Sequence, residues 1–252
     1  AGIPSAPAAA KLAPQRAAMA AAQRRAARRL AAVLCQLGVR SLASSPDAAS
    51  RLAAPPRALR PVASWHGEVA RNGSFGESLA VLRWYTDAAA ANYRGLNRRL
   101  RTAGPASAAA AGAEAEAMDA LLGAGPRLAE PGLTLWRGFQ SGDFVQWIVT
   151  EKAKQVTDLA YMSCSLQRSV GNFYARRHAV LPEDLEDAVL LKIHAPAGAK
   201  VLCVACASAG VPSEEEILLP RGSVLQVKHV RPRNASTDVH MIEAQLEVQE
   251  GT

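Results

Sequence analysis

The chain has 252 residues, 49% of them hydrophobic, and is therefore long enough to bury one substantial core and to carry a tail beside it. No apolar run approaches the ~20 residues that a membrane-spanning helix needs, so the sequence predicts neither a membrane span nor a membrane partner. The chain starts at Ala1 and shows no signal-peptide segment, so we expect the beginning of the natural protein to be missing.

The formal net charge of +7 is unevenly distributed. The first 60 residues contain ten lysines and arginines against the single acid Asp47, so this segment carries +9 and the rest of the chain −2. A basic segment attached to a near-neutral domain is typical of a flexible arm. Because neither zinc-finger spacing nor interleaved aromatic residues accompany the arginines, nucleic acid is not an expected partner.

The four cysteines are Cys35, Cys164, Cys203 and Cys206. The last two form a Cys-x-x-Cys motif inside the apolar run VLCVACA, but no second pair of Cys or His residues lies at metal-binding spacing. Cysteine behaves as a small hydrophobic residue, so we interpret this pair as buried free thiols and predict no metal site. Free thiols are typical of a protein that acts in a reducing compartment.

The amino-terminal 60 residues are rich in Ala, Pro, Ser and Arg and contain one predicted helix, from Pro14 to Leu37. Before Leu30 nearly all of the apolar content is alanine, which buries too little surface to fold alone. We therefore expect residues 1–60 to be a partly disordered basic arm, with a linker over residues 44–61.

The next elements are a helical region, a low-complexity loop and a short helix, predicted over residues 78–101, 104–112 and 114–122. The helical region is expected to be interrupted around Gly95 and to hold Trp84 and Tyr85 in its packing core. The Gly-x-Gly that follows the short helix lacks a third glycine, so it is not a dinucleotide-binding fingerprint.

From Leu133 onward the hydrophobic period changes from that of helices to that of strands. Strands are predicted over residues 133–137, 159–165, 187–194, 200–205, 216–219, 223–230 and 239–248. Helices are predicted over residues 143–154 and 168–178. Many short strands with few helices between them pair mostly antiparallel, so the sequence predicts an α+β fold.

Three consecutive carboxylates, Glu214, Glu215 and Glu216, stand between a turn and the apolar run ILLP. Side chains alternate along a strand, so Glu214 and Glu216 are expected to point into one cleft. Two such charges repel and need a cation, a metal, a sugar hydroxyl or a shared proton. Pro220 and Gly222 disfavour a helix that starts at a Ser213-x-x-Glu216 capping box, whereas an ordinary solvated acidic turn fits the spacing equally well.

Four motifs resemble those of the arginine-specific mono-ADP-ribosyltransferases and occur in that family's order. They are WYT with YRGLNRRLR within residues 84–101, LTLWRG at 133–138, YMSCSL at 161–166, and Glu-x-Glu before ILLPRGS at 214–223. Each motif alone is unspecific, but together they cover about two thirds of the chain.

The resemblance implies an ADP-ribosyltransferase-like fold of the α+β class. It implies two packed, roughly perpendicular and mostly antiparallel sheets, with an amino-terminal helical lobe to one side and NAD, the substrate, in the cleft. After the arm over residues 1–60, the helical lobe would cover residues 61–130 and the β-core residues 131–252.

The resemblance also assigns residues to NAD. Arg137, a permanent cation, would bind phosphate or ribose oxygens through its planar fork; the alternative is a surface salt bridge. Gly138 would let the backbone approach the nicotinamide amide closely. Phe173 or Tyr174 would stack on the nicotinamide ring, unless these aromatic side chains belong to the core.

The implied catalytic roles fall on two carboxylates and a serine. Glu216 would accept a hydrogen bond from the ribose 2′-hydroxyl and stabilise the cationic transition state, and Ser163 would fix its rotamer. Glu214 would hold the acceptor guanidinium and take its proton. Ser165 would support the turn, and Cys164 stands where family members most often have threonine.

The resemblance therefore implies an enzyme that moves ADP-ribose from NAD to an arginine of a host protein, secreted by a bacterium and delivered into the host cytoplasm. The turn before Glu214 departs from the family, because it lacks the aromatic residue that usually helps to choose the acceptor. Two alternatives stay open: an inactive arginine- or peptide-binding module, and an NAD glycohydrolase that uses water. An arginine of the amino-terminal arm is a further expected occupant of the acceptor cleft, against the alternative of a solvated linker.

Overall fold

A computed structural model describes residues 55–65, 76–87, 92–103, 112–177, 182–204, 215–234 and 238–248. The predicted helix from Pro14 to Leu37, most of the basic arm and Glu214 lie outside these residues. None of the described helices is long and apolar enough to span a membrane.

Residues 60–65 are helical, and the other described helices and helical turns are η1 (Arg57–Leu59), α3 (Gly76–Thr86), α4 (Asn92–Ala103), α5 (Gly112–Ala124), α6 (Gly142–Val145), η3 (Gln146–Thr150), α7 (Arg168–Arg176) and η4 (Pro182–Asp187). The described strands are β1 (Leu133–Gln140), β2 (Gln155–Asp158), β3 (Met162–Ser165), β4 (Ala188–Ala195), β5 (Leu202–Cys203), β6 (Glu216–Leu219), β7 (Ser223–Arg231) and β8 (His240–Leu246). Every one of these strands except β2 overlaps a strand that the sequence predicted.

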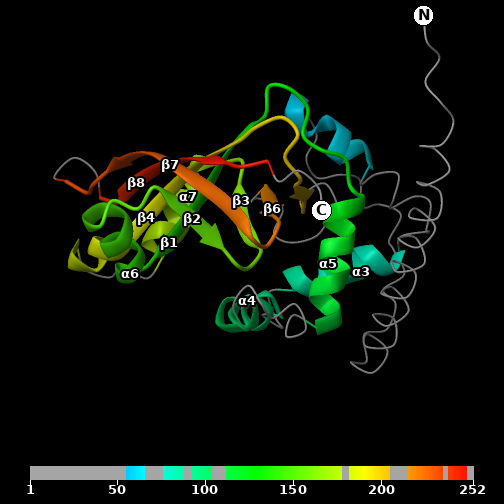
Figure 1. The fold of residues 1–252 in the computed structure, drawn as a ribbon, viewed down its shortest axis with the longest axis horizontal. Helices are drawn as coiled ribbons and strands as arrows, with labels where there is room; N and C mark the ends of the chain where they lie inside the picture. The colour runs from blue at the N-terminus through cyan, green and yellow to red at the C-terminus, as the bar shows by residue number, and fades with distance from the viewer. Residues whose placement is uncertain are drawn as a thin grey trace, which may run out of the picture.

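The strands form one mixed sheet in the order β2-β7-β8-β4-β1-β3-β6-β5 (Figure 1). Among the described strands only the pair β4 and β8 is parallel, which confirms the α+β class. The resemblance implied two separate sheets, whereas hydrogen bonds join all the described strands. The join is narrow, because β1 and β3 pair only at Trp136 and Ser165.

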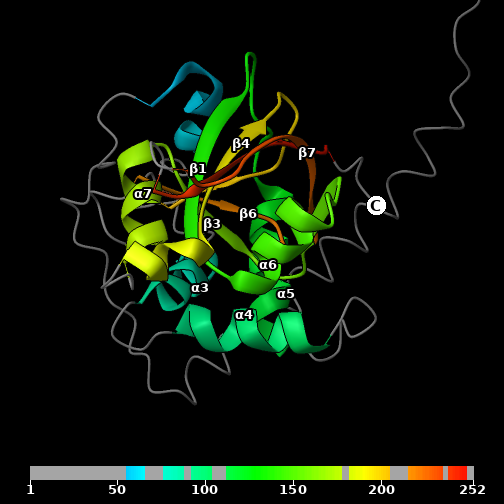
Figure 2. The same cartoon turned by 90° about the vertical axis from the view of Figure 1, so that its left-hand side faces the viewer.

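Helices α3, α4 and α5 lie together on one side of the sheet (Figure 2). Their buried apolar side chains, such as Leu82, Leu96 and Met118, form a cluster with Tyr161 and Leu218 from the β3–β6 part of the sheet. A second cluster, which includes side chains of β1, β4 and β8, fills much of the rest of the β-core. The helical lobe therefore packs directly against the strands that carry the predicted Ser and Glu motifs.

Helix α7 packs against β1 at an unusually close approach, which two glycines permit. A Cβ atom on Gly138 would lie 1.8 Å from the carbonyl oxygen of Gly171, and a Cβ on Gly171 would lie 2.9 Å from Leu190 Cδ1. Any side chain at Gly138 would therefore displace the helix. This packing accounts for Gly138 without a ligand, whereas the sequence analysis explained it by an approach of the backbone to nicotinamide.

Two local predictions were wrong. The break in the helical region follows Thr86, and Gly95 lies inside α4, where a helix tolerates it at modest cost. The strand predicted from Leu159 begins only at Met162. The carboxylate of Asp158 accepts a hydrogen bond from the backbone N–H of Ala160 at 3.0 Å, a local turn that competes with the extended conformation.

The predicted linker over residues 44–61 extends too far. Ala58 and Leu59 are buried in the core of the β-sheet part, and the N–H of Ala129 donates to the carbonyl of Ala58 at 3.0 Å. The packed part of the chain therefore includes residues before Pro61, because these apolar side chains find a site on the core.

The prediction of a free thiol is wrong for Cys203, and Cys206 lies outside the described residues. Cys164 is a buried free thiol, whose pKa burial raises to about 12. Cys203 is disulfide-bonded, and its partner lies outside the described residues. Since disulfides are typical of oxidising compartments, the inference of a reducing compartment loses its basis.

Glu243 on β8 provides a test of how the exposed sheet face is stabilised. His194 Nε2 lies 2.6 Å from its Oε1 and Lys192 Nζ lies 3.1 Å from the same atom. The hydrogen bond with His194, and then that with Lys192, lower the pKa of Glu243. A lowered pKa stabilises the fold above the ordinary glutamate pKa, and this contribution is lost as the pH falls through the lowered value.

At pH 7, Glu243→Gln should therefore unfold at a lower urea concentration than the wild type. The free energy of unfolding should fall by about 1 kcal/mol or less, because the group is partly exposed. The difference should shrink as the pH falls below the ordinary range of a glutamate. Urea unfolding at pH 7 and at pH 3 measures it, and a difference that does not change with pH would contradict this explanation.

Candidate active site

Ser163 and Glu216 meet on neighbouring antiparallel strands. In the ladder of β3 and β6, Ser165 pairs with Glu216 and Ser163 with Leu218, so Ser163 and Glu216 are diagonal neighbours on one face. The hydroxyl of Ser163 donates to Glu216 Oε1 at 2.5 Å. The hydrogen bond that the resemblance implied is therefore present, and it orients a half-buried carboxylate.

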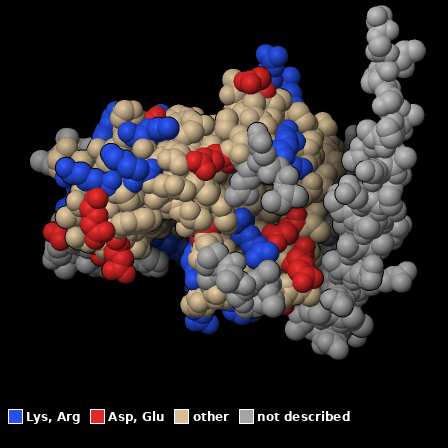
Figure 3. Space-filling model, viewed as in Figure 1, with Lys and Arg blue, Asp and Glu red and all other residues tan. Residues whose placement is uncertain are grey.

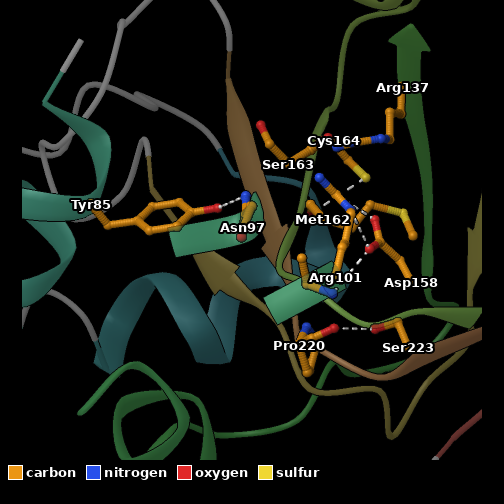
Figure 4. Close-up of polar contacts among 11 residues, drawn as sticks. Tyr85, Asn97, Arg101, Arg137, Asp158, Met162, Ser163, Cys164, Pro220 and Ser223 are labelled. Carbon is orange, nitrogen blue, oxygen red and sulfur yellow. Dashed lines mark hydrogen bonds and ion pairs between the residues drawn. The ribbon is translucent and has the colours of Figure 1, made fainter. Parts of the chain in front are cut away.

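Arg137 extends from β1 toward Ser163 on β3 (Figure 4). Its Nη1 donates to the carbonyl oxygen of Ser163 at 2.7 Å, and its guanidinium lies 5.8 Å from the centre of the Phe139 ring. No described acid forms a salt bridge with Arg137, so the surface-salt-bridge alternative finds no partner there. A guanidinium has five N–H donors, and the described contact with Ser163 occupies one of its nitrogens.

Tyr85 in the helical lobe is influenced by the charges of this site. It is 2% exposed, and its hydroxyl accepts a hydrogen bond from Asn97 Nδ2 at 2.8 Å. Burial raises the pKa of Tyr85 most, and the negative charge of Glu216 adds to it, while Asn97, Arg137 and Arg101 act in the opposite direction. Tyr85 is therefore a neutral phenol within electrostatic reach of Glu216, and it lies in the core as the sequence predicted.

Asp158 is a residue near the site that sequence reasoning missed. Arg101, the last arginine of the LNRRLR motif, donates to both carboxylate oxygens of Asp158, from Nε at 3.0 Å and from Nη2 at 2.9 Å (Figure 4). This paired contact ties α4 to β2. No signal in the sequence marked Asp158, because it lies 57 residues from Arg101 in a strand that was not predicted.

Ser165 and Cys164 have structural surroundings. The hydroxyl of Ser165 accepts a hydrogen bond from the backbone N–H of Gln167 at 2.9 Å, so it supports the turn into α7 as expected. Cys164 points into the core, and its thiol stays protonated because burial raises its pKa. A protonated buried thiol is a poor nucleophile, so the chemistry of the site falls on Glu216 rather than on Cys164.

Of the aromatic pair Phe173 and Tyr174 on α7, Phe173 does not belong to the core. Phe173 is 60% exposed and its ring meets that of Tyr174 edge to face, with centroids 5.3 Å apart. The Arg177 guanidinium lies 5.6 Å from the centre of the Tyr174 ring. The core alternative is therefore wrong for Phe173, and stacking on nicotinamide stays a prediction.

The strand alternation that predicted Glu214 and Glu216 on one face is absent at Glu215. Strand β6 begins at Glu216, and Glu215 has a φ of 44°, in the left-handed region. Strand alternation therefore does not extend back through Glu215, and Glu214 lies outside the described residues. Its predicted role stays a prediction.

The arrangement provides an oriented carboxylate, a cation from the neighbouring strand and a neutral buried phenol. Asn97 Oδ1 is buried without a hydrogen-bond partner among the described residues. Within the same part of the chain, no group of three His, Cys, Asp or Glu side chains is placed to hold a metal ion. A carboxylate can accept a sugar hydroxyl and stabilise a developing cation, and a guanidinium can bind phosphate.

Ser163→Ala tests whether the serine orients Glu216. Removing the hydroxyl frees the carboxylate rotamer without changing the charge of the site, so kcat for nicotinamide release should fall about tenfold, as a lost bond to a charged group suggests. Steady-state kinetics with NAD, together with thermal unfolding, measures this. An unchanged kcat in a stably folded variant would show that Glu216 needs no help from Ser163.

Comparison with known proteins places the chain in a family. The model of the ADP-ribosyltransferase exoenzyme family matches residues 77–249. No curated protein sequence matches the chain significantly.

Solved structures of bacterial ADP-ribosyltransferases share the fold. Plx2a, a toxin from Paenibacillus larvae, is 18% identical with a TM-score of 0.53, and the match covers 75% of this chain and 92% of that one. HopU1 of Pseudomonas syringae is 16% identical with a TM-score of 0.52, over 73% and 81% of the two chains. Exoenzyme S from Pseudomonas aeruginosa, solved with human 14-3-3 protein beta and carba-NAD, is 17% identical with a TM-score of 0.51, over 75% and 84%.

At such identities the structures support the fold, while the family model covers more than half of the sequence and includes Arg137, Ser163 and Glu216. The chain belongs to the ADP-ribosyltransferase exoenzyme family.

Proposed function

We propose that this protein transfers ADP-ribose from NAD to an arginine of a host protein, and that Glu216, Ser163 and Arg137 form its active site. NAD is the substrate of the family to which the chain belongs. The observation that carries the proposal is the chain of contacts from Arg137 Nη1 to the Ser163 carbonyl and from the Ser163 hydroxyl to Glu216. These contacts join residues from three strands at one point of the sheet.

The residues of the site suit the charges of NAD. Arg137 supplies a permanent cation with a planar fork for the diphosphate or the ribose oxygens. Glu216 supplies a carboxylate whose Oε1 is engaged by Ser163.

The reaction needs stabilisation of positive charge more than a strong base. When the bond from nicotinamide nitrogen to ribose C1′ breaks, its electron pair leaves with nicotinamide and positive charge develops on the ribose. Glu216 would stabilise that charge and accept the 2′-hydroxyl hydrogen bond, so it acts on the transition state. The guanidinium nitrogen of the acceptor then forms the new bond to C1′ and loses a proton, which we assign to Glu214 as general base.

The face of the molecule seen in Figure 3 gives no sign of a single charged partner. The face seen in Figure 3 carries basic and acidic side chains interspersed over the described residues. We therefore infer arginine as the acceptor from the Glu-x-Glu motif and not from the distribution of charge on the surface. The arginines of the amino-terminal arm stay a second candidate acceptor, and secretion into a host cell stays part of the proposal.

The test is incubation of the full chain with NAD, measuring nicotinamide by chromatography, with and without an arginine analogue. The proposal expects release in both cases and ADP-ribose attached to the analogue when it is present. Release without any transfer would favour the NAD glycohydrolase. Binding of the analogue without any release would favour the inactive binding module.

Glu214→Ala separates the two halves of the reaction. The variant should still release nicotinamide with water as acceptor, because Glu216 and Arg137 remain, but transfer to the arginine analogue should fall about 100-fold, the range for loss of a general base. The ratio of transferred to hydrolysed ADP-ribose measures this. Equal loss of both activities would contradict the proposed division of roles between the two glutamates.

A further inference from the structure

Asp119, in the middle of α5, connects two segments that flank the active-site strands. Its Oδ1 accepts a hydrogen bond from the hydroxyl of Tyr161 at 2.7 Å, and its Oδ2 accepts from Arg221 Nε at 2.7 Å. Arg221 Nη2 also lies 2.7 Å from Oδ2, so the guanidinium binds the carboxylate through two nitrogens. We call Asp119, Tyr161 and Arg221 the Asp119 clamp.

The clamp lies at one end of the ladder that β3 and β6 form. Tyr161 directly precedes β3, and Arg221 follows β6 after a single residue. The first pair of the ladder is Met162 with Leu219, and the last is Ser165 with Glu216. One carboxylate of the helical lobe therefore binds residues from both strands at the end of the ladder away from Glu216.

The β3–β6 ladder is buried in the core, but it forms few residue pairs with the neighbouring strands of the sheet. In the described residues β3 joins β1 at one residue pair, and β6 joins β5 at two. A slip of one residue between paired strands turns each side chain to the opposite face. Such a slip would separate the hydroxyl of Ser163 from Glu216, so the register of these two short strands decides whether the site exists.

The charges and burial of the clamp suit a permanent contact. Tyr161 is fully buried, and this burial is the main cause that raises its pKa. The charge of Asp119 raises the pKa further, so the phenol stays protonated. The hydrogen bond to Asp119 is the main cause that raises the pKa of Arg221, which stays charged. The carbonyl of Ala115 lies 2.8 Å from the Tyr161 hydroxyl, so Asp119 and this carbonyl, both from α5, share the single proton of the phenol.

Tyr161 also connects the clamp to the site through a ring contact. Its ring meets that of Tyr85 edge to face, with centroids 5.8 Å apart. The charge of Glu216 in turn contributes to the raised pKa of Tyr85. Displacing Tyr161 would therefore disturb the site through the strand and through this neighbouring phenol.

We propose that Asp119 is a positioning residue, which holds β3 and β6 in the register that lets Ser163 orient Glu216. This inference rests on the proposed function of Glu216. Asp119 itself touches neither NAD nor the reacting atoms, and it acts only through the two strands.

The kinetic test compares Asp119→Ala with Met118→Ala in the full chain. Met118 is the buried neighbour of Asp119 in α5 and belongs to the same apolar cluster as Tyr161, so its truncation destabilises the same helix but removes none of the clamp's hydrogen bonds. At a temperature where both variants are folded, Asp119→Ala should lower kcat for nicotinamide release about 10- to 100-fold, as a displacement of about 1 Å does. Its KM for NAD should change less than about twofold, and Met118→Ala should keep its kcat.

A second comparison shows whether Asp119 acts through Ser163. Because both substitutions disturb the same carboxylate, Asp119→Ala should lower kcat clearly less in a Ser163→Ala background than in the wild type. Equal factors in the two backgrounds, or an equal loss of kcat in Met118→Ala, would overturn the proposal.

Amide hydrogen exchange tests the clamp without any activity. Residues 162–165 and 216–219 should exchange faster in Asp119→Ala than in Met118→Ala. A wild-type chain that releases no nicotinamide would refute the proposed function, while the exchange rates would still decide whether the clamp fixes the register. Exchange in Asp119→Ala at the wild-type rate would overturn the proposal that the clamp fixes the register.

Discussion

Replacing Glu216 with glutamine should lower kcat for nicotinamide release about 1,000-fold, the upper range for removing one group that stabilises transition-state charge. Glutamine has the shape of glutamate, and its amide oxygen can still accept the hydrogen bond from Ser163. The substitution therefore removes mainly the negative charge. Since that charge acts on the cationic transition state, NAD binding should change only a few-fold.

Single-turnover release of nicotinamide gives the chemical step, and calorimetry gives the affinity for NAD. Glu215→Gln is a matched control, because it makes the same chemical change at the preceding residue, whose φ of 44° places it outside the strand. That control should keep its activity. Glu216→Gln with wild-type kcat would remove Glu216 from the chemistry, and an equal loss in both variants would show only that the acidic stretch needs its charge.

Replacing Arg137 with lysine should weaken NAD binding about 10- to 100-fold, as expected when two charge-assisted hydrogen bonds are reduced to a point contact. Lysine keeps the positive charge but has no planar fork. It also has one nitrogen in place of three, so it cannot bind the Ser163 carbonyl and a phosphate with the same geometry. The loss should appear in both affinity and kcat, because the bond to Ser163 steadies the strand that orients Glu216.

Arg127→Lys provides the matched control for this variant. Arg127 Nη1 donates to the carbonyl of Gly198 at 2.7 Å, the same kind of contact that Arg137 makes, but with a different part of the chain. Its replacement should leave the affinity for NAD unchanged. Wild-type affinity in Arg137→Lys, measured by calorimetry, would exclude Arg137 from the binding site.

Sequence reasoning predicted the strands that have a clear hydrophobic alternation or an apolar run. It missed β2, whose four residues Gln155–Asp158 are too short and polar to show a period. It also extended β3 back to Leu159, because the side-chain turn at Asp158 is a local contact that no periodicity reveals. Burial of Ala58 and Leu59 was equally invisible, since a core position is decided by the tertiary packing.

The pairing of Ser163 with Glu216 across 53 residues came from the resemblance to a family and not from spacing. Strand alternation failed at Glu215, where a left-handed backbone conformation intervenes. The Asp119 clamp could not be predicted, because Tyr161 and Arg221 lie 42 and 102 residues from Asp119. Contacts at such separations depend on how the helical lobe packs against the sheet.

The central claim is that the site of Arg137, Ser163 and Glu216 cleaves NAD. The most direct measurement is the time course of nicotinamide release from NAD by the wild-type chain, followed by chromatography beside the Glu216→Gln variant. We expect release that rises with time and with wild-type enzyme concentration, and almost none from the variant. Intact NAD after incubation with a folded wild-type chain, or equal release by both proteins, would contradict the claim.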